Sequence, residues 1–174
     1  MMDEKIYNSI NRIDDSYYPL IGARNVQRFF IRKPDEYIKY GMNLAAPRKY
    51  EIFSVPRLLI NRILSKEKID VTYSDDIMIN NTDVFNIILK KGESFDIYLL
   101  LAIIGSKLCA FYFKTSNVNL DRGAYPKLNV NNILSFSLPE YISESMKAEI
   151  SNLSKAMLKL NIQLQDKKNK FQSR

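Results

Sequence analysis

The sequence predicts an α+β protein in which a small mixed or antiparallel β-sheet domain with a buried helix precedes a long, coiled-coil-like helix. Three observations predict this arrangement. Short apolar runs, separated by Gly, Asn and Asp turn signals, fill residues 20–90. A long apolar stretch follows at 97–113, and from residue 143 apolar side chains recur at alternating spacings of four and three. We therefore expect a domain at 1–142 and a C-terminal heptad helix at 143–174.

The first forty residues predict a short helix followed by strands. Ile6, Ile10 and Ile13 have helical spacing, which favours an amphipathic helix over 3–16, and Pro19 ends it because the residue before a proline disfavours helix. Residues 20–31 are typical of a strand, a turn and a second strand, and 37–40 of a further short strand.

The middle of the chain predicts the rest of the sheet and the buried helix. Apolar and β-branched runs indicate strands at 55–63, 71–73, 77–79 and 85–90. We then expect one buried helix over 95–113, a polar surface loop over 115–132 and a short strand over 133–138.

The C-terminal segment predicts an a/d packing seam, with Ser143 as the N-cap of its helix. The seam consists of Met146, Ile150, Leu153, Met157, Leu160, Leu164 and Phe171. A seam this narrow favours one partner helix, which is helix 3–16, another chain or a missing part of a longer protein. The alternative is an ordinary C-terminal helix lying across the domain.

The composition excludes several kinds of catalytic site. The chain has no His and one Cys, so it can build no Ser-His-Asp or Cys-His machinery and no common Cys/His zinc site. Its five glycines are too far apart for a phosphate-binding loop. Pro34, Asp35, Glu36 and Lys39 do not have the spacing of a carboxylate–metal nuclease, and Cys109 is expected to be a small core residue. We expect no catalytic residue, no metal and no cofactor.

The charge favours a polyanionic partner. The formal net charge is +7, and residues 63–100 are the one acidic segment in an otherwise basic chain. Clustered Lys and Arg neutralise phosphates, although a basic protein without a nucleic-acid partner explains the same total. The N-terminus lacks signal-peptide character and the apolar stretch is short and interrupted for a membrane span, so we expect a cytoplasmic protein without membrane contact.

Five segments carry local patterns that occur together in a known family. They are 17–31 (YYPLIGARNVQRFFI), 55–62 (VPRLLINR), 79–88 (INNTDVFNII), 104–114 (IGSKLCAFYFK) and 124–139 (AYPKLNVNNILSFSLP). In this order they resemble the TaqI-like C-terminal specificity domain, the target-recognition part of fused restriction–modification methyltransferases. One departure is Gly105, where that family often has Asn.

The resemblance implies a non-catalytic, sequence-specific DNA-binding domain, similar in architecture to the recognition domains of type I specificity subunits. The chain would be a fragment or separately encoded piece of a DNA adenine methyltransferase or restriction enzyme. The methyl donor and any metal would belong to another domain. The implied partners are double-stranded DNA and a catalytic domain or subunit. Residues 143–171 resemble the spacer and docking helices of type I subunits, and a homodimer through this helix is possible.

Basic and polar side chains in three regions are the candidate DNA contacts, because Lys and Arg hold phosphates and Arg also pairs with guanine. They are Arg24, Arg28 and Arg32 in a row near the first turn; Arg57 and Arg62 at the ends of an apolar strand; and Lys114, Asn119, Arg122, Tyr125 and Lys127 in or beside the predicted loop. The alternative function is a protein-interaction module that dimerises through its C-terminal helix and has no nucleic-acid role.

Overall fold

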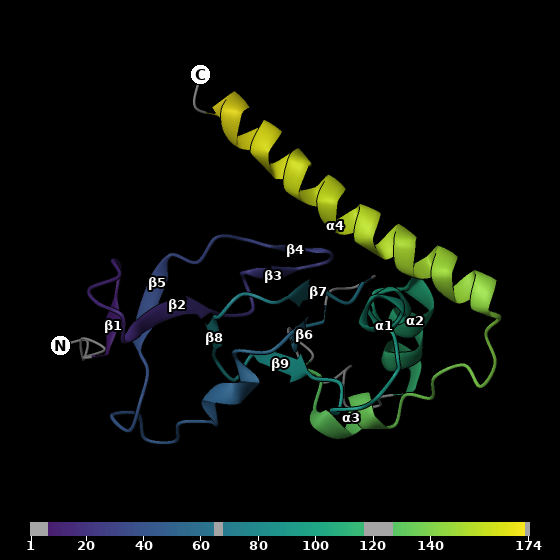
Figure 1. Cartoon of the computed structure of the whole chain (residues 1–174), viewed down its shortest axis with the longest axis horizontal. Helices are drawn as coiled ribbons and strands as arrows, with labels where there is room; N and C mark the ends of the chain where they lie inside the picture. Colours follow the sequence, from purple (N-terminus) through teal and green to yellow (C-terminus); the bar gives the residue numbers. More distant parts are fainter. Residues whose placement is uncertain (1–6, 65–67, 117–126, 173–174) are drawn as a thin grey trace.

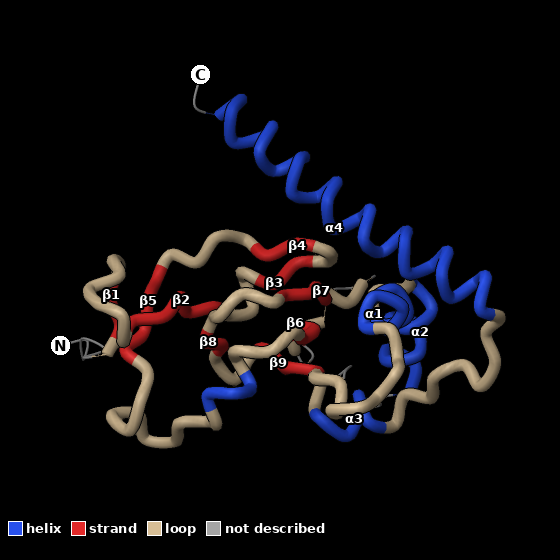
Figure 2. The backbone as a smooth tube through the Cα atoms, viewed as in Figure 1, coloured by secondary structure: helices blue, strands red, loops and turns tan. Residues whose placement is uncertain are grey.

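A computed structural model describes residues 7–64, 68–116 and 127–172 of the chain. Within them, small sheets occupy the N-terminal half and helices the C-terminal half (Figure 1; Figure 2). Short strands, a packed helix and a long C-terminal helix confirm the predicted α+β class.

A mixed four-stranded sheet lies at the N-terminal end of the molecule, in the order β1-β5-β2-β8. Its strands are β1 (Asn8–Ser9), β2 (Tyr17–Ile21), β5 (Glu36–Lys39) and β8 (Ile79–Asn80). The β1–β5 and β2–β5 pairs are antiparallel, whereas β2 and β8 run parallel, with Leu20 opposite Ile79.

The predicted N-terminal helix is wrong for the described part of 3–16, because Asn8–Ser9 form β1 there. Ile10 is 80% exposed, so the apolar positions that suggested a helix have no surface to cover. Asp14 instead closes a turn, since its side chain accepts a hydrogen bond from the Ser16 N–H and its carbonyl accepts one from the Tyr17 N–H. Such local side-chain bonding competes with helix formation.

The strand–turn–strand predicted over 20–31 is confirmed in outline. After β2, a turn leads into the two-stranded hairpin β3 (Val26–Gln27) and β4 (Phe30–Ile31), which Arg28 and Phe29 connect. Phe29 has φ of 58°, a left-handed conformation that is uncommon outside glycine. Its ring is buried in the core, and its N–H donates to the carbonyl of Val71, so tertiary contacts hold this backbone in place.

The central sheet is antiparallel, in the order β7-β6-β9. It consists of β6 (Arg57–Asn61), β7 (Val71–Ser74) and β9 (Val84–Ile87), which confirms the strands predicted at 55–63, 71–73 and 85–90 in outline. Every residue of β6 is buried. A short 3-10 helix, η1 (Tyr50–Ile52), precedes this sheet.

The helices α1 (Ile97–Ile104) and α2 (Lys107–Ser116) replace the single helix expected over 95–113. The axis bends by 58° between them. At the break, a Cβ on Gly105 would lie 3.0 Å from the Leu101 carbonyl oxygen and 3.3 Å from a Val71 methyl carbon, so α1 packs tightly there against β7. The side chain of Asp96 caps α1 by accepting from the N–H groups of Tyr98 and Leu99.

Two apolar clusters form the core. The larger lies between the central sheet and α1 and α2, and it includes Leu58, Ile60, Leu101 and Phe113. The smaller includes Ile21, Leu59 and Val84 and joins the sheets. None of the described helices is by itself long and apolar enough to cross a membrane, although α1 and α2 taken together across their bend pass that test by length and composition.

Helix α3 (Val130–Leu134) lies where the sequence predicted the end of a loop and the start of a strand, so the strand expected over 133–138 is wrong. A capping box explains the helix: Asn129 accepts from the Asn132 N–H, and the Asn132 side chain accepts from the Asn129 N–H. The following residues form no described strand.

The long C-terminal helix is confirmed as α4 (Glu144–Gln172). The Ser143 hydroxyl accepts from the Met146 N–H at 3.3 Å, as expected for the N-cap. At 1.5 Å per residue, α4 is about 43 Å long. Figure 1 shows its N-terminal half lying against α1 and its C-terminal half extending past the hairpin, away from the sheets.

Candidate nucleic-acid interface

The hairpin β3–β4 positions the three arginines of the first predicted group. Arg24 precedes β3 and Arg32 follows β4, and the two strand ends are joined because the Arg32 N–H donates to the Asn25 carbonyl at 2.7 Å. Arg28 lies at the other end of the hairpin, in its turn. The predicted row is therefore two exposed arginines at the hairpin base and one half-buried arginine at its tip.

Arg24 has carboxylate neighbours that the sequence analysis did not pair with it. Its guanidinium lies 3.3 Å from an oxygen of Asp35 and 3.7 Å from one of Glu36, and the Arg24 and Asp35 side chains are mostly exposed. Exposed ion pairs contribute only about 0–1 kcal/mol, so Arg24 can exchange these partners for a phosphate at little cost.

Arg28 lies in a more constrained setting. Its N–H donates to the Asp70 carboxylate at 3.0 Å, which ties the hairpin tip to the segment before β7. Its guanidinium lies 5.6 Å from the centre of the Phe29 ring, within the range of a cation–π contact. The Phe29 ring thus helps to orient the Arg28 guanidinium at the protein surface.

Arg57 is completely buried, so it is not available to a phosphate or a base, contrary to its assignment as a DNA contact. Its guanidinium donates to the carbonyls of Val55, Asp76 and Met78 at 3.0–3.1 Å. Burial lowers its pKa, and the charges of Asp76 and Asp75 oppose that shift. Arg57 therefore holds the start of β6 against the loop before β8.

Arg62 is half-buried and connects distant segments. Its Nε donates to the Leu128 carbonyl at 3.1 Å and its Nη1 to the Thr82 carbonyl at 2.8 Å, and its guanidinium lies 4.8 Å from the centre of the Phe85 ring. These contacts give Arg62 a positioning role, because it anchors the chain at Leu128, within the segment predicted as a loop.

The loop candidates divide into described and undescribed residues. Lys127 pairs with Asp83 at 2.9 Å, and Lys114 is exposed in the last turn of α2. Asn119, Arg122 and Tyr125 lie outside the described residues, so their placement stays a prediction.

Sequence reasoning missed the buried amides that hold these loops. Asn25 accepts from the Gly22 N–H at 2.9 Å, which fixes the turn carrying Arg24. Asn61 donates to the Ala23 carbonyl, and Asn80 donates to the Val84 carbonyl and accepts from the Asn86 side chain. The available signal was Asn in a turn or at a strand end, where its side chain often bonds nearby backbone.

Helix α4 packs on the domain through a face other than its predicted seam. Ser151 and Ser154 are buried, and the half-buried Leu158 packs against the larger core cluster. In contrast, the seam side chains Leu153 and Leu160 are 59% and 57% exposed. Met146, Met157, Leu164 and Phe171 are also exposed, and Ile150 is half-buried. The apolar seam is therefore presented outward by the described chain.

The described residues contain no cluster of three or more His, Cys, Asp or Glu side chains that could hold a metal ion. Burial raises the pKa of the Cys109 thiol to about 12, which keeps it protonated and unreactive at neutral pH. Cys109 is fully buried in the larger core cluster, as expected for a small core residue.

The sequence profile of the TaqI-like C-terminal specificity domain matches residues 18–138, which confirms the resemblance. The match begins within β2 and covers the other strands except β1, the hairpin, α1, α2 and α3, and it ends before α4. No curated protein matches the chain. Specificity domains of this kind serve target recognition in restriction–modification systems and are not themselves catalytic.

Proposed function

The chain belongs to the TaqI-like C-terminal specificity domain family, and we propose that it binds double-stranded DNA in a sequence-specific manner. The observation that carries the proposal is the pair of exposed arginines, Arg24 and Arg32, at the base of a hairpin inside the matched region. A net charge of +7 supports it, because phosphate neutralisation dominates affinity for DNA.

The candidate residues divide by role. Arg24, Arg28 and Arg32 contact phosphates from a hairpin whose geometry is fixed by Asn25 and Asp70. Lys114 and Lys127 flank residues 117–126 and contact phosphates beside that segment. Asn119, Arg122 and Tyr125 read base edges. Arg57 is excluded by burial, and Arg62 acts through the position of Leu128.

The second part of the proposal concerns partners. The catalytic groups, the methyl donor and any metal belong to a methyltransferase or restriction domain or subunit, and the protein works with it in the cytoplasm. The outward-facing seam of α4 docks against a helix of that partner or of a second copy. Exposed apolar surface of this kind marks interaction sites.

A protein-interaction module without DNA binding is the second candidate. The exposed seam favours it, because that surface needs a protein partner whether or not DNA is bound. In this case the basic charge is incidental.

A titration of random duplex DNA at several salt concentrations separates the two. For DNA binding we expect affinity to fall steeply with salt, and the double variant Arg24→Ala/Arg32→Ala to flatten the slope of log affinity against log salt by about two units. Arg12→Ala is the matched control, because Arg12 is also an exposed arginine paired with a carboxylate but lies before β2. If the wild-type protein binds no duplex DNA at low salt, the proposal of DNA binding is wrong.

A further inference from the structure

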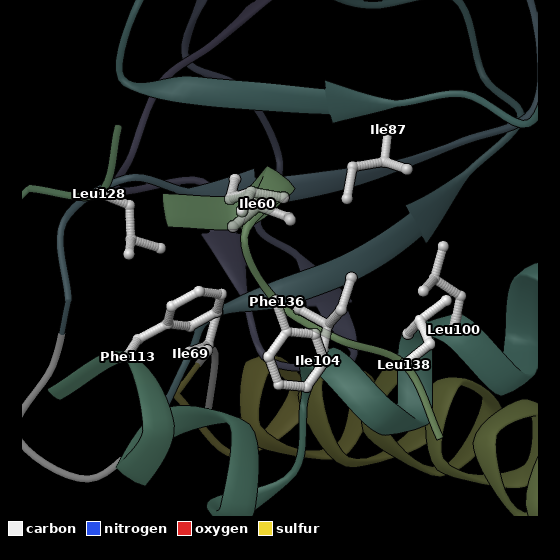
Figure 3. Close-up of a pocket in the computed structure, with 10 residues that line it drawn as sticks. Ile60, Ile69, Ile87, Leu100, Ile104, Phe113, Leu128, Phe136 and Leu138 are labelled. Carbon is white, nitrogen blue, oxygen red and sulfur yellow. The ribbon is translucent and has the colours of Figure 1, made fainter. Parts of the chain in front are cut away.

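A partly open apolar cavity of about 170 Å³ lies in the larger core cluster. Its walls come from β6, β9, α1 and α2, and its cover comes from the segment 128–138. Figure 3 shows Ile60, Ile87, Ile104, Phe113 and Phe136 among the side chains arranged around it. Protein interiors are close-packed and contain few voids larger than a water molecule, so this void is an unusual feature of the core.

The lining determines what the cavity can hold. All of the lining side chains are Ile, Leu or Phe, so they offer no hydrogen bond to a guest. Water against these walls gains few hydrogen bonds, and an enclosed cavity of about 150 Å³ with a similar lining binds benzene or xenon. A guest that fits must be uncharged and apolar, with about the volume of benzene.

The cover supplies a route of entry. Leu138 is 42% exposed at the edge of the cavity, and Ile133 and Phe136 are only partly buried. A hydrogen bond from the Tyr112 hydroxyl to the Ser135 carbonyl at 3.2 Å fixes this segment over α2. The cavity is therefore only partly covered by this short segment and remains partly open to solvent.

We propose that this cavity is a binding site for a small hydrocarbon-like molecule of about six to eight carbon atoms. The guest stabilises the segment 128–138 over the sheet. Because Arg62 bonds Leu128 at the start of this segment, the guest also stabilises the chain beside Lys127. The proposal stands on the cavity alone and does not depend on DNA binding.

Benzene is the probe for the test. We expect benzene to shift the NMR signals of the Ile60, Ile104 and Leu128 methyl groups with saturable dose dependence and to raise the thermal midpoint of the full chain. Ile133→Phe adds volume at the cavity wall, and we expect it to weaken benzene binding at least tenfold. Leu134→Phe is the matched control, because Leu134 lies next in α3 but is 75% exposed and does not line the cavity.

Two results overturn the proposal. One is the absence of saturable methyl shifts in the wild-type chain up to the aqueous solubility of benzene. The other is equal benzene affinity in wild type and Ile133→Phe. If Ile133→Phe does not fold, Leu138→Trp replaces it, since position 138 borders solvent and tolerates a larger side chain. Equal benzene affinity in wild type and Leu138→Trp then overturns the proposal.

Discussion

Single residues in this protein show that the type of a side chain does not determine its role. Arg57 and Arg24 are both arginines near strand ends, yet Arg57 is buried and bonds three carbonyls, whereas Arg24 faces solvent and two carboxylates. The sequence around Arg57 predicted the buried strand correctly. It could not show that the charge itself is buried, because the carbonyls of Asp76 and Met78 approach only in the folded chain.

Replacing Arg57 by Met should destabilise the fold while removing no DNA contact. The buried Met78 carbonyl and the partly buried carbonyls of Val55 and Asp76 lose their donor. A buried unsatisfied group costs about 1–3 kcal/mol, so we expect a loss of at least about 1 kcal/mol in the free energy of unfolding. Urea denaturation measures it. The exposed Arg12 provides the control, since Arg12→Met should change stability by less than about 0.5 kcal/mol. Equal stability of the two variants contradicts the anchoring role.

The thiol of Cys109 should resist alkylation in the native protein. Its pKa is raised to about 12 by burial, so the reactive thiolate is almost absent at pH 8. We expect a thiol reagent to modify the folded chain at the rate of unfolding and the denatured chain at once. Mass spectrometry over a time course tests this, and fast labelling of the folded chain at pH 8 shows that the site is accessible.

At the scale of elements, the sequence predicted the strands and the long helix better than the helix ends and short helices. β6 follows from the apolar run Leu58–Ile60, and α4 from its period and from Ser143. The break at Gly105 was missed because the apolar pattern continues on both sides, and tight packing of Gly105 on Val71 is a tertiary contact. α3 was missed because a capping box, rather than periodicity, stabilises it.

The N-cap Asp96 makes α1 sensitive to acid. Burial raises the pKa of its carboxyl. Hydrogen bonds from the Ser151 hydroxyl and from the N–H groups of Tyr98 and Leu99 lower it by more than burial raises it, so the pKa lies below the ordinary value of 3.8. A lowered pKa gives stability that is present above the unfolded pKa and lost as pH falls through the folded pKa. Asp96→Ala should cost about 1 kcal/mol at pH 7.

The matching measurement is denaturation of wild type and Asp96→Ala from pH 7 to pH 2. We expect the difference in unfolding free energy to shrink below about pH 4. Ser143→Ala, which removes the N-cap of α4 without removing a carboxylate, serves as the comparison and should show a pH-independent cost. If the difference in unfolding free energy between wild type and Asp96→Ala stays constant from pH 7 to pH 2, the charge of Asp96 does not stabilise α1.

The two faces of α4 should respond differently to charge. Leu153→Asp/Leu160→Asp places carboxylates on exposed positions, so we expect less than about 1 kcal/mol of change in monomer stability but loss of association with a partner helix. Ser154→Asp buries a charge against the domain and should cost at least about 2 kcal/mol. Denaturation and sedimentation of both variants separate the faces. A large monomer destabilisation by the leucine pair would show that the seam packs within the chain.

At the scale of the whole molecule, the domain and α4 present two surfaces with different chemistry. The hairpin base carries exposed cations, and the seam carries exposed apolar side chains. The candidate site was predictable only in part. Charge and spacing identified the hairpin arginines, but the pairing of Arg24 with Asp35 and the clamp of Arg62 on Leu128 join residues that are distant in sequence. Such contacts depend on the tertiary fold.

The division between phosphate contact and base reading is the last prediction, and it needs a target selected from a random duplex library. On that target and on random DNA, Arg24→Ala/Arg32→Ala should weaken binding by similar factors, because phosphate contacts carry no sequence information. Arg122→Ala should instead cost about 1–3 kcal/mol on the selected target and little on random DNA, as expected for a base-edge contact. Titrations at two salt concentrations measure both. The hairpin suits phosphate contact because Asn25 and Asp70 hold it in one geometry, whereas connecting segments in proteins commonly carry the residues that set specificity. Equal losses on both duplexes for Arg122→Ala would assign Arg122 to the phosphates and leave the choice of target to other residues.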